Sequence, residues 1–462
     1  MNNRTPSPGH RAAWTSVAVR RLLPTILASA VLAAPVAGQG SNGRLTLDAL
    51  YHSVDSLSPR VAGARASADA ALARVPGNRR LPDPRLQLAT MNRQLPGFDL
   101  QQPLGMNQIQ LTQMFPIPGT GKLGLAEDVA RSLADAGQAQ VGESIWDQRA
   151  RAAMAFYDLY QAEGTLTIMR ETLRLLEAVS SSVNGMYAVG EAKQADVLRA
   201  QLEIGRMTGQ VADMEAMRRT MAARLNTVLN RPPDVPTGSP QLPIFPDTLP
   251  TTDSVIATAL ASRGMLQAGA DQIRAATAAE QLARREIWPD LEVGVIYGWQ
   301  PMSGGGTDQM LSLMVGASVP IWAGSRQLKM RDETAAMRQM AVADLAAMQS
   351  DTRGRVAELV AEFERTRDLH ILYGQTLLPQ AEATASSARA AYQVGGVDFM
   401  TYLDAIMTVY GYRSQVVRLD AEQGQALADD PPVVVVLGVR YRGEPVADLV
   451  DGAPGGAGGR FG

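Results

Sequence analysis

Hydrophobic residues recur along the chain with two different periods. In long stretches they stand three and four positions apart, which is the spacing of one face of a helix. In four short stretches they alternate with polar residues, which is typical of strands with one apolar face. Over the first half, the pattern predicts a helix at 45–80, strands near 86–88 and 109–115, a helix from Lys122 to about Met186, and a helix from about Lys193 to Asn230.

The second half repeats the same order of elements. It predicts a helix at 254–286, strands at 291–299 and 311–319, a helix from Arg326 to about Tyr392, and a last helix that begins near Asp398, a good capping residue. Phe115-Pro116-Ile117 and Val319-Pro320-Ile321 lie 204 residues apart, as do Ser58 and Ser262. Tyr187-Ala188-Val189-Gly190 and Tyr392-Gln393-Val394-Gly395 lie 205 apart. A constant offset across several landmarks indicates one structural unit written twice.

We therefore expect one architecture in two copies, although the length alone would suit two or three domains. The first copy spans 39–240, with a β-hairpin at about 84–116, and the second spans 241–430, with a β-hairpin at about 290–320. A proline-rich linker joins them. Residues 431–462 do not follow the repeat, because prolines stop the last helix early and a valine run and a glycine-rich end follow. This tail is predicted to be disordered or strand-like.

Residues 1–38 have the features of a secretory signal peptide. Four arginines form a basic leader, an apolar run of 16 residues extends from Leu22 to Ala37, and small residues follow. A membrane anchor is the alternative, but the run is shorter than the about 20 residues that a helical span needs. No later stretch is long and apolar enough for a transmembrane helix, so any membrane insertion would have to use strands.

Composition excludes several classes of function. The chain has no cysteine and only three histidines, His10, His52 and His370, which argues against disulfides, thiolate chemistry and a histidine-built zinc site. Four of the 43 basic residues and no acidic residue lie in 1–38, so the remaining chain carries 39 basic and 46 acidic residues and a formal charge of −7. That acidic balance argues against nucleic acid.

An enzyme is also disfavoured. Gly119-Thr120-Gly121-Lys122 has the look of a phosphate-binding loop, but Pro116 stands where its first glycine belongs and Leu123 replaces the serine or threonine. No Ser-His-Asp or paired-carboxylate arrangement stands out. We therefore predict no catalytic residue, no cofactor and no metal site.

The predicted hairpins and helices together suggest a membrane pore. Each strand has about ten residues, the length of a tilted strand that crosses a bilayer, and Tyr297 and Trp299 would lie where aromatic girdles occur. A small soluble sheet packed on helices is the alternative. Four strands cannot close a barrel, which needs about eight, so the chain would form a cyclic oligomer, and three copies would supply twelve strands. The helix from Lys122, at about 95 Å, is too long for a globule.

Several motifs make the chain similar to the TolC family of outer-membrane efflux channels, over roughly 42–430. They are Phe115-Pro116-Ile117-Pro118-Gly119, the Tyr187–Gly190 turn with Asp196-Val197-Leu198, and the Tyr392–Gly395 turn with Tyr402-Leu403-Asp404-Ala405. The resemblance implies a mostly α fold with a membrane β part: long antiparallel helical hairpins form an α-barrel, and a homotrimer closes a twelve-stranded β-barrel. It also implies a place in the outer membrane of a Gram-negative-type bacterium, in contact with its lipid and extending into the periplasm.

The same resemblance assigns partners and site residues. It implies a tripartite pump completed by a periplasmic adaptor, or membrane fusion protein, and an inner-membrane pump. The turn tips would contact the adaptor through Tyr187, Val189, Gly190, Tyr392, Val394 and Gly395. Acidic residues after the second turn narrow the periplasmic opening in the family; Asp404 matches one such position, Thr401 departs from the other, and Asp196 is a weaker candidate from the first copy.

The sequence leaves alternatives open for the transported substrate and for the function of the protein. Phe-Pro-x-Pro-Gly followed by Gly-Lys-Leu most resembles the heavy-metal cation branch of the family, while drugs and other small molecules remain possible substrates. The alternative function is a periplasmic coiled-coil adaptor or scaffold, which would explain the long helices but neither the duplicated hairpins nor, for a soluble scaffold, the signal.

Overall fold

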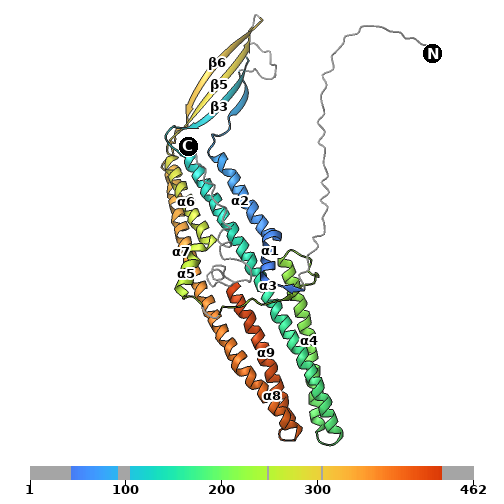
Figure 1. The fold of residues 1–462 in the computed structure, drawn as a ribbon. Coiled ribbons are helices and arrows are strands. Elements are labelled where there is room, and N and C mark those ends of the chain that lie inside the picture. Colours follow the sequence, from blue (N-terminus) through green and yellow to red (C-terminus); the bar gives the residue numbers. More distant parts are fainter. Residues whose placement is uncertain (1–42, 92–104, 247–248, 303–304, 429–462) are drawn as a thin grey trace, which may run out of the picture. The chain divides into compact units, whose positions relative to one another are not determined.

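The computed structural model describes residues 43–91, 105–246, 249–302 and 305–428. The predicted signal peptide at 1–38 and the tail at 431–462 lie outside these residues. The first copy contains the following elements: β1 (Arg44–Leu45), α1 (Leu47–Leu57), α2 (Pro59–Asn78), β2 (Arg85–Met91), β3 (Met106–Pro116), α3 (Lys122–Ala188) and α4 (Gln194–Val228) (Figure 1). The second contains β4 (Ser239–Pro240), α5 (Thr252–Ser262), α6 (Gly264–Arg285), β5 (Asp290–Pro301), β6 (Thr307–Ala317), α7 (Gln327–Ile371), the π-helical turn η1 (Leu372–Leu377), α8 (Leu378–Gln393) and α9 (Phe399–Ala428).

Corresponding helices of the two copies keep one offset in the structure. Helices α3 and α7 begin at Lys122 and Gln327, and α4 and α9 begin at Gln194 and Phe399, so both pairs start 205 residues apart. The ends of α3 and α8, at Ala188 and Gln393, also differ by 205. An offset that is the same at both ends of the long helices lets each helical position of one copy be matched to one position of the other.

Three predicted helices are interrupted, and all three predictions of a continuous helix were wrong. The helix at 45–80 begins only at Leu47 and breaks at Ser58, whose extended ψ of 117° is the backbone conformation that a following proline, Pro59, favours. The helix at 254–286 breaks at Arg263, whose ψ of 117° is extended and which is the counterpart of Ser58 in the second copy. The helix from Arg326 to Tyr392 is interrupted by η1, immediately before Leu378-Pro379. Proline has no N–H, and its ring collides with the carbonyl four residues earlier, so an α-helical turn cannot continue unchanged there.

The strands form one four-stranded antiparallel sheet in the order β2-β3-β5-β6. The hairpins of the two copies therefore pair side by side through β3 and β5, with Leu111 opposite Val295 and Val295 opposite Leu313. A second, two-stranded contact pairs β1 with β4 in parallel and fastens the segment between the copies to the start of α1. The sheet lies at one end of this unit, and the turns at the far ends of α3 and α8 lie at the other (Figure 1).

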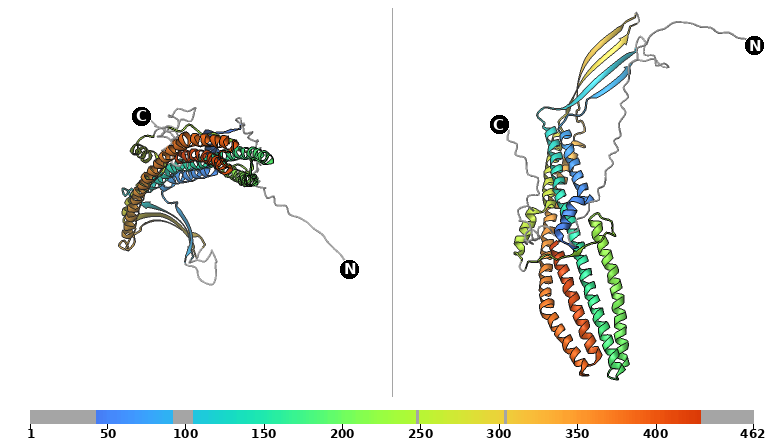
Figure 2. Two further views of the ribbon diagram at one scale, coloured as in Figure 1. Left: turned by 90° about the horizontal axis from the view of Figure 1, so that it is seen from below. Right: turned by 45° about the vertical axis from the view of Figure 1, so that its right-hand side comes forward.

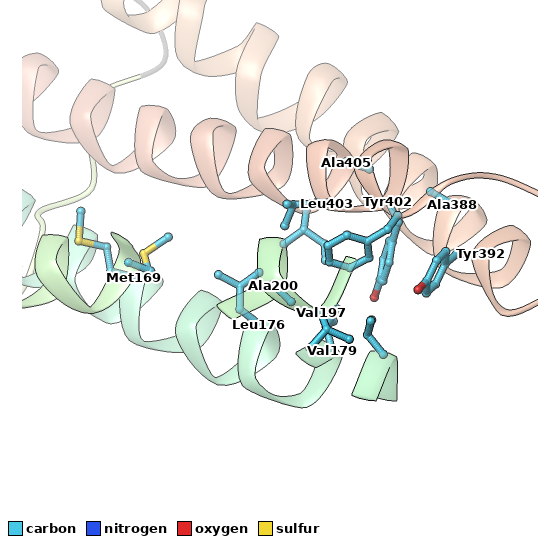
Figure 3. Packing of buried hydrophobic residues seen from close by; sticks show 14 residues of the cluster. Met169, Leu176, Val179, Val197, Ala200, Ala388, Tyr392, Tyr402, Leu403 and Ala405 are labelled. Atoms are coloured by element: carbon cyan, nitrogen blue, oxygen red, sulfur yellow. The ribbon is translucent and has the colours of Figure 1, made fainter. Parts of the chain in front are cut away.

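The helices pack as antiparallel neighbours, α3 beside α4 and α8 beside α9, and each pair runs to its own turn (Figure 2). A core of buried residues joins the two pairs near the turns; it includes Met169, Leu176 and Val183 from α3 and Phe399, Tyr402 and Leu403 from α9 (Figure 3). A second core, farther from the turns, centres on Phe156 and Tyr157. None of the described helices is long and apolar enough to cross a membrane.

Candidate functional site

The two predicted turns are closed by the same backbone geometry. Gly190 and Gly395 have φ angles of 83° and 74°, in the left-handed region that residues with a Cβ avoid. Beyond each glycine the chain turns back on the helix, and the N–H of Glu191 donates to the carbonyl of Met186 at 2.8 Å. The N–H of Gly396 donates to the carbonyl of Ala391 at the same distance. This is the glycine-dependent way of ending a helix, and it explains the glycine in both motifs.

The side chains of the two turns differ more than their sequences. Tyr187, Val189 and Val394 are exposed, and Tyr187 retains 46% of its surface. Its counterpart Tyr392 is only 8% exposed, because its ring packs against Tyr402 and Phe399 at centroid distances of 5.9 and 5.7 Å. Figure 3 shows Tyr392 and Tyr402 extending from their own helices toward those of the first copy.

Among the predicted contact residues of the two motifs, Tyr187, Val189 and Val394 are therefore the exposed side chains. Burial, together with the nearby charge of Asp196, raises the pKa of Tyr392, so its hydroxyl stays neutral at physiological pH. The aromatic partners of Tyr392 were not among the predicted site residues. Their signal is the aromatic pair at 399 and 402, where the first copy has Gln194 and Val197.

The three gate candidates have different local roles. Thr401 donates its backbone N–H and its hydroxyl to Oδ1 of Asp398, at 2.9 and 2.5 Å, so this pair caps α9 and confirms the predicted helix start. The carboxylate of Asp196 accepts the N–H of Lys193 at 3.3 Å and caps α4 in the reverse direction. Asp404 is exposed, one turn into α9, and its carboxylate makes no hydrogen bond or ion pair with the described residues. Thr401 and Asp196 are thus both used in helix capping, whereas the carboxylate of Asp404 is not.

The four-stranded sheet has one apolar and one polar face. Since residues directly opposite each other in a sheet share a face, the register places the following side chains together on one side: Leu86, Leu88, Ile109, Leu111, Phe115, Leu291, Val293, Val295, Tyr297, Trp299, Leu311, Leu313 and Val315. Leu88 and Leu311, on the two outer strands, are both 75% exposed. The other face carries glutamines, small residues and five methionines: Met91, Met106, Met114, Met310 and Met314. The alternation that the sequence predicted is present in the folded sheet.

Aromatic residues stand at both ends of the apolar strands. The rings of Tyr297 and Trp299 lie 5.9 Å apart near the outer end of β5. At the helical end, Trp288 precedes β5, Trp322 follows β6, and both are exposed. The sequence interpretation missed this second pair, although tryptophans directly flanking the predicted strands were a visible signal. Trp299 lies nine residues beyond Asp290, the first residue of β5, or about 30 Å along the strand.

Lys122 joins the strands to the helices. Its side chain is 7% exposed, and its ammonium group donates to the carbonyl of Trp288 at 2.8 Å and to Asp290 at 2.9 Å. Glu286 lies 3.6 Å away. The residues around it, with Gly121 at a φ of 69° before the helix, therefore form a structural junction between α3 and β5 rather than a phosphate-binding loop.

A partly buried polar contact ties three helices together midway along the bundle. The hydroxyl of Tyr160 on α3 donates to Asp420 on α9 at 3.3 Å, and Nδ1 of His370 on α7 lies 2.9 Å from the same carboxylate. Burial raises the pKa of Asp420, while the charge of His370 acts in the opposite direction. Within the described ranges, no three histidine, aspartate or glutamate side chains are placed to hold a metal ion.

Comparison with known proteins connects these features to a family. A family model described as outer membrane efflux protein matches residues 255–429. Among curated protein sequences, none matches the chain.

Solved structures resemble this fold over most of its length. A membrane protein from Pseudomonas aeruginosa has a TM-score of 0.72 at 19% identity, over 84% of this chain and 93% of that one. The outer membrane protein VceC from Vibrio cholerae has a TM-score of 0.69 at 17% identity, over 85% and 96%. The open state of the MtrE outer membrane channel of Neisseria gonorrhoeae has a TM-score of 0.70 at 17% identity, over 84% and 88%. At these identities the likeness establishes the fold.

Proposed function

Because the chain belongs to the TolC-like outer membrane efflux proteins, we propose that it is the passive exit duct of a tripartite export pump. The duct crosses the outer membrane and extends into the periplasm, and the chain itself catalyses no reaction. The observation that carries this proposal is a sheet with an exposed apolar face and two outer strands, set at the end of very long helices.

The sheet has the chemistry of a segment of a membrane barrel. Lipid covers an apolar outer face, and a closed ring of strands leaves no unpaired backbone at its edges. Strands β2 and β6 are the outer strands of the sheet, so three chains joined edge to edge would supply twelve strands. The aromatic residues at both strand ends support this placement. A rise of about 30 Å tilted by about 40° spans roughly 23 Å, close to the apolar band of about 25 Å in such barrels.

The helices supply the periplasmic part of the duct. Helix α3 has 67 residues, which corresponds to a length of about 100 Å. The turns at its far end would meet the periplasmic adaptor, with Tyr187, Val189 and Val394 as the exposed contacts. Gly190, Gly395 and the backbone at Tyr392 complete that surface, and the adaptor connects the duct to an inner-membrane pump that provides the transport energy.

The opening between the turns would be controlled by the helices that carry Gly190 and Gly395. Three copies of Asp404 around one axis would form a ring of like charge that attracts cations and repels anions. A disulfide engineered between Val189 and Val394 of adjacent turns, in a chain without cysteine, should block efflux and release it under reductant. Efflux that continues under oxidising conditions, with the disulfide formed, would contradict gating at the turns.

We expect soft metal cations to be the substrates, because of the methionines on the polar face of the sheet. Thioethers are soft ligands that prefer ions such as Cu(I), and five methionines lie on the face that would line the pore. Gly298 stands directly opposite Met310, and Met106 lies over the same glycine, so flexible thioethers occupy this part of the wall. Exchange of these methionines for leucine should reduce silver or copper tolerance and leave drug tolerance unchanged. Equal loss of both, or of neither, would remove the preference for soft cations.

The decisive experiment measures mass and conductance on one sample. Purified protein in detergent is sized and then added to a planar bilayer. A trimer that gives stable channels supports the duct. A monomer that stays soluble without detergent and does not conduct would favour the other function, a periplasmic coiled-coil adaptor or scaffold.

A further inference from the structure

A groove lies where the apolar face of the sheet meets the helices. It has a volume of about 450 Å³ and lies between the end of α2, the start of α3 and the first residues of β5, a size typical of small-molecule sites. One wall is the motif Phe115-Pro116-Ile117-Pro118-Gly119, continued by the residues up to Gly124. The turns, the gate and the pore face of the sheet do not use this motif, so its role is still to be assigned.

The wall of the groove presents carbon and few hydrogen-bond donors. Pro116 and Pro118 have no N–H. Thr120 is 7% exposed, and its hydroxyl and N–H both donate to the carbonyl of Ile117, at 2.8 and 3.2 Å. Lys122 lines the groove, but its ammonium group is already engaged in the junction described above. Such a lining suits hydrocarbon better than a polar ligand.

Glycines keep the groove open. Gly119, Gly121 and Gly124 all line it, and a Cβ added at any of them would meet no atom within 4 Å. Gly119 and Gly121 have φ angles of 89° and 69°, which account for these two glycines. Gly124 lies in the first turn of α3, where glycine is a poor helix former. The backbone gives no reason for that glycine, whereas the open space beside it does.

The groove continues the apolar face of the sheet. Phe115, Leu291 and Val293 line the groove and also belong to that face. Trp288, three residues before Leu291, is exposed, and indole rings concentrate at the level of lipid headgroups. One end of the groove therefore reaches the level of the headgroups, and the other runs along the strands into the apolar band. This is the shape that a phospholipid with one acyl chain against the protein requires.

Two arginines stand at the helical end of the groove. Arg79 and Arg80 directly precede Leu81, which lines the groove, and both are exposed. Arg79 lies 3.5 Å from Glu127, whereas Arg80 makes no ion pair with the residues that the structure describes. One acid, Asp83, follows, so the stretch 79–83 keeps a net positive charge. A guanidinium binds a phosphate in a two-pronged geometry, so the charge at this end suits a lipid phosphate.

We propose that the groove binds one phospholipid of the periplasmic leaflet, with an acyl chain against Phe115, Ile117 and Leu291 and its phosphate on Arg80. This rests on the proposed function, which turns the apolar face of the sheet toward lipid. The site differs from general lipid contact, because a rigid loop and the ends of two helices enclose the chain. A lipid bound there fills the space between α2, α3 and β5 and fastens the sheet to the helices.

Lipid binding to the purified channel tests the groove. Native mass spectrometry of the detergent-solubilised protein, titrated with dioleoylphosphatidylglycerol, counts the lipids that each chain keeps, and the unmodified chain should keep one. Gly124→Leu puts a side chain where two or more methylene groups of the lipid would lie, so the affinity should fall about tenfold. Gly185→Leu, near the other end of α3 and equally free of neighbours, should bind like the unmodified chain. Equal binding by the two variants would indicate ordinary annular lipid only and overturn the site.

A second pair of variants tests the headgroup contact. Arg80→Gln should weaken binding of dioleoylphosphatidylglycerol about fivefold, whereas Arg74→Gln, exposed on the same helix, should not change it. Diolein, which has the same chains and no phosphate, should bind more weakly and should not distinguish Arg80→Gln from the unmodified chain. Diolein that binds as tightly as the phospholipid would overturn the assignment of the phosphate to Arg80.

Conductance of the same samples separates this proposal from the duct. Stable channels in a planar bilayer, formed by protein that keeps no phospholipid, would overturn the lipid site and leave the duct intact. A monomer that stays soluble without detergent and does not conduct would overturn both.

Discussion

Replacing Gly424 by alanine would place a methyl carbon against the ring of Tyr157, where the two copies approach most closely. The added Cβ would lie 2.1, 2.3 and 2.6 Å from three ring atoms, far inside ordinary van der Waals contact. Tyr157 is 2% exposed and is held between Phe156 and Phe245, so its ring cannot turn aside into solvent. The helices must separate or the ring must leave its position.

The expected loss follows from two opposing effects. Overpacking of this severity costs about 3 kcal/mol, at the upper end of the usual range. Alanine returns about 1 kcal/mol through its higher helix propensity. The free energy of unfolding should therefore fall by about 2 kcal/mol. Gly411, in the same helix, has nothing within 4 Å of an added Cβ, so Gly411→Ala should raise the free energy of unfolding by up to about 1 kcal/mol.

Loss of helical circular dichroism with increasing guanidinium chloride, in detergent, measures both variants on one scale. Gly424→Ala should unfold at a lower denaturant concentration than the unmodified chain, and Gly411→Ala at the same or a higher one. Tyr157→Leu should lessen the effect of Gly424→Ala, because the two residues share one space. A Gly424→Ala variant as stable as Gly411→Ala would refute the close packing of α3 on α9.

Three further changes test the other parts of the structure. Asp404→Asn should lower cation preference in single-channel recordings under a salt gradient, and unchanged selectivity would remove Asp404 from the constriction. Hydrogen bonds from the hydroxyl of Thr401 and then from its N–H hold the pKa of Asp398 below its usual 3.8, so this cap stabilises the fold above about pH 4 and is lost as the pH falls through the folded-state pKa. Asp398→Ala should flatten that acid limb in a plot of unfolding midpoint against pH, and a superimposable plot would exclude the cap as its source. Leu313→Arg, on the apolar face of β6, should cost about 2–4 kcal/mol at mid-membrane and reduce the amount of assembled channel in outer-membrane fractions, whereas Ser312→Arg, on the opposite face, should be tolerated; equal loss for both would contradict the assignment of the faces.

Local patterns predicted the elements well because their causes are local. The apolar stripe from Met169 to Met186 lies in one helix, and the alternation around Val295 lies in one strand. Glycines at 190 and 395 end helices through their own backbone freedom. Two of the three interruptions were also signalled locally, by Pro59 and Pro379, but a strong helical period on both sides concealed them. The third break, at Arg263, has no proline beside it. The pairing of β3 with β5 joins residues 174 to 192 positions apart, so no local pattern could indicate it.

Comparison of the two copies shows which predictions about site residues depend on the surrounding side chains. Tyr187 and Tyr392 occupy the same position in the same motif, yet one is exposed and the other buried, because only the second copy supplies aromatic residues at 399 and 402. Repetition therefore predicts backbone geometry better than side-chain environment. An exposed tip can be inferred from the motif, but which of its side chains reaches a partner depends on residues outside it.

Comparison of the two copies at the starts of α4 and α9 distinguishes acidic residues that cap a helix from one that does not. At each start one acidic side chain accepts an unpaired N–H group. The two copies place that acid differently: it is Asp196 at the fourth position in the first copy and Asp398 at the first position in the second. Thr401, the counterpart of Asp196, therefore lacks a charge because the cap already has one. An acid-to-threonine change at this position needs no functional explanation. Asp404 has no such duty, since its counterpart is Arg199 and its carboxylate lies beyond the capped turn. It is consequently the position at which a change of charge tests the proposed ion selectivity without removing a helix cap.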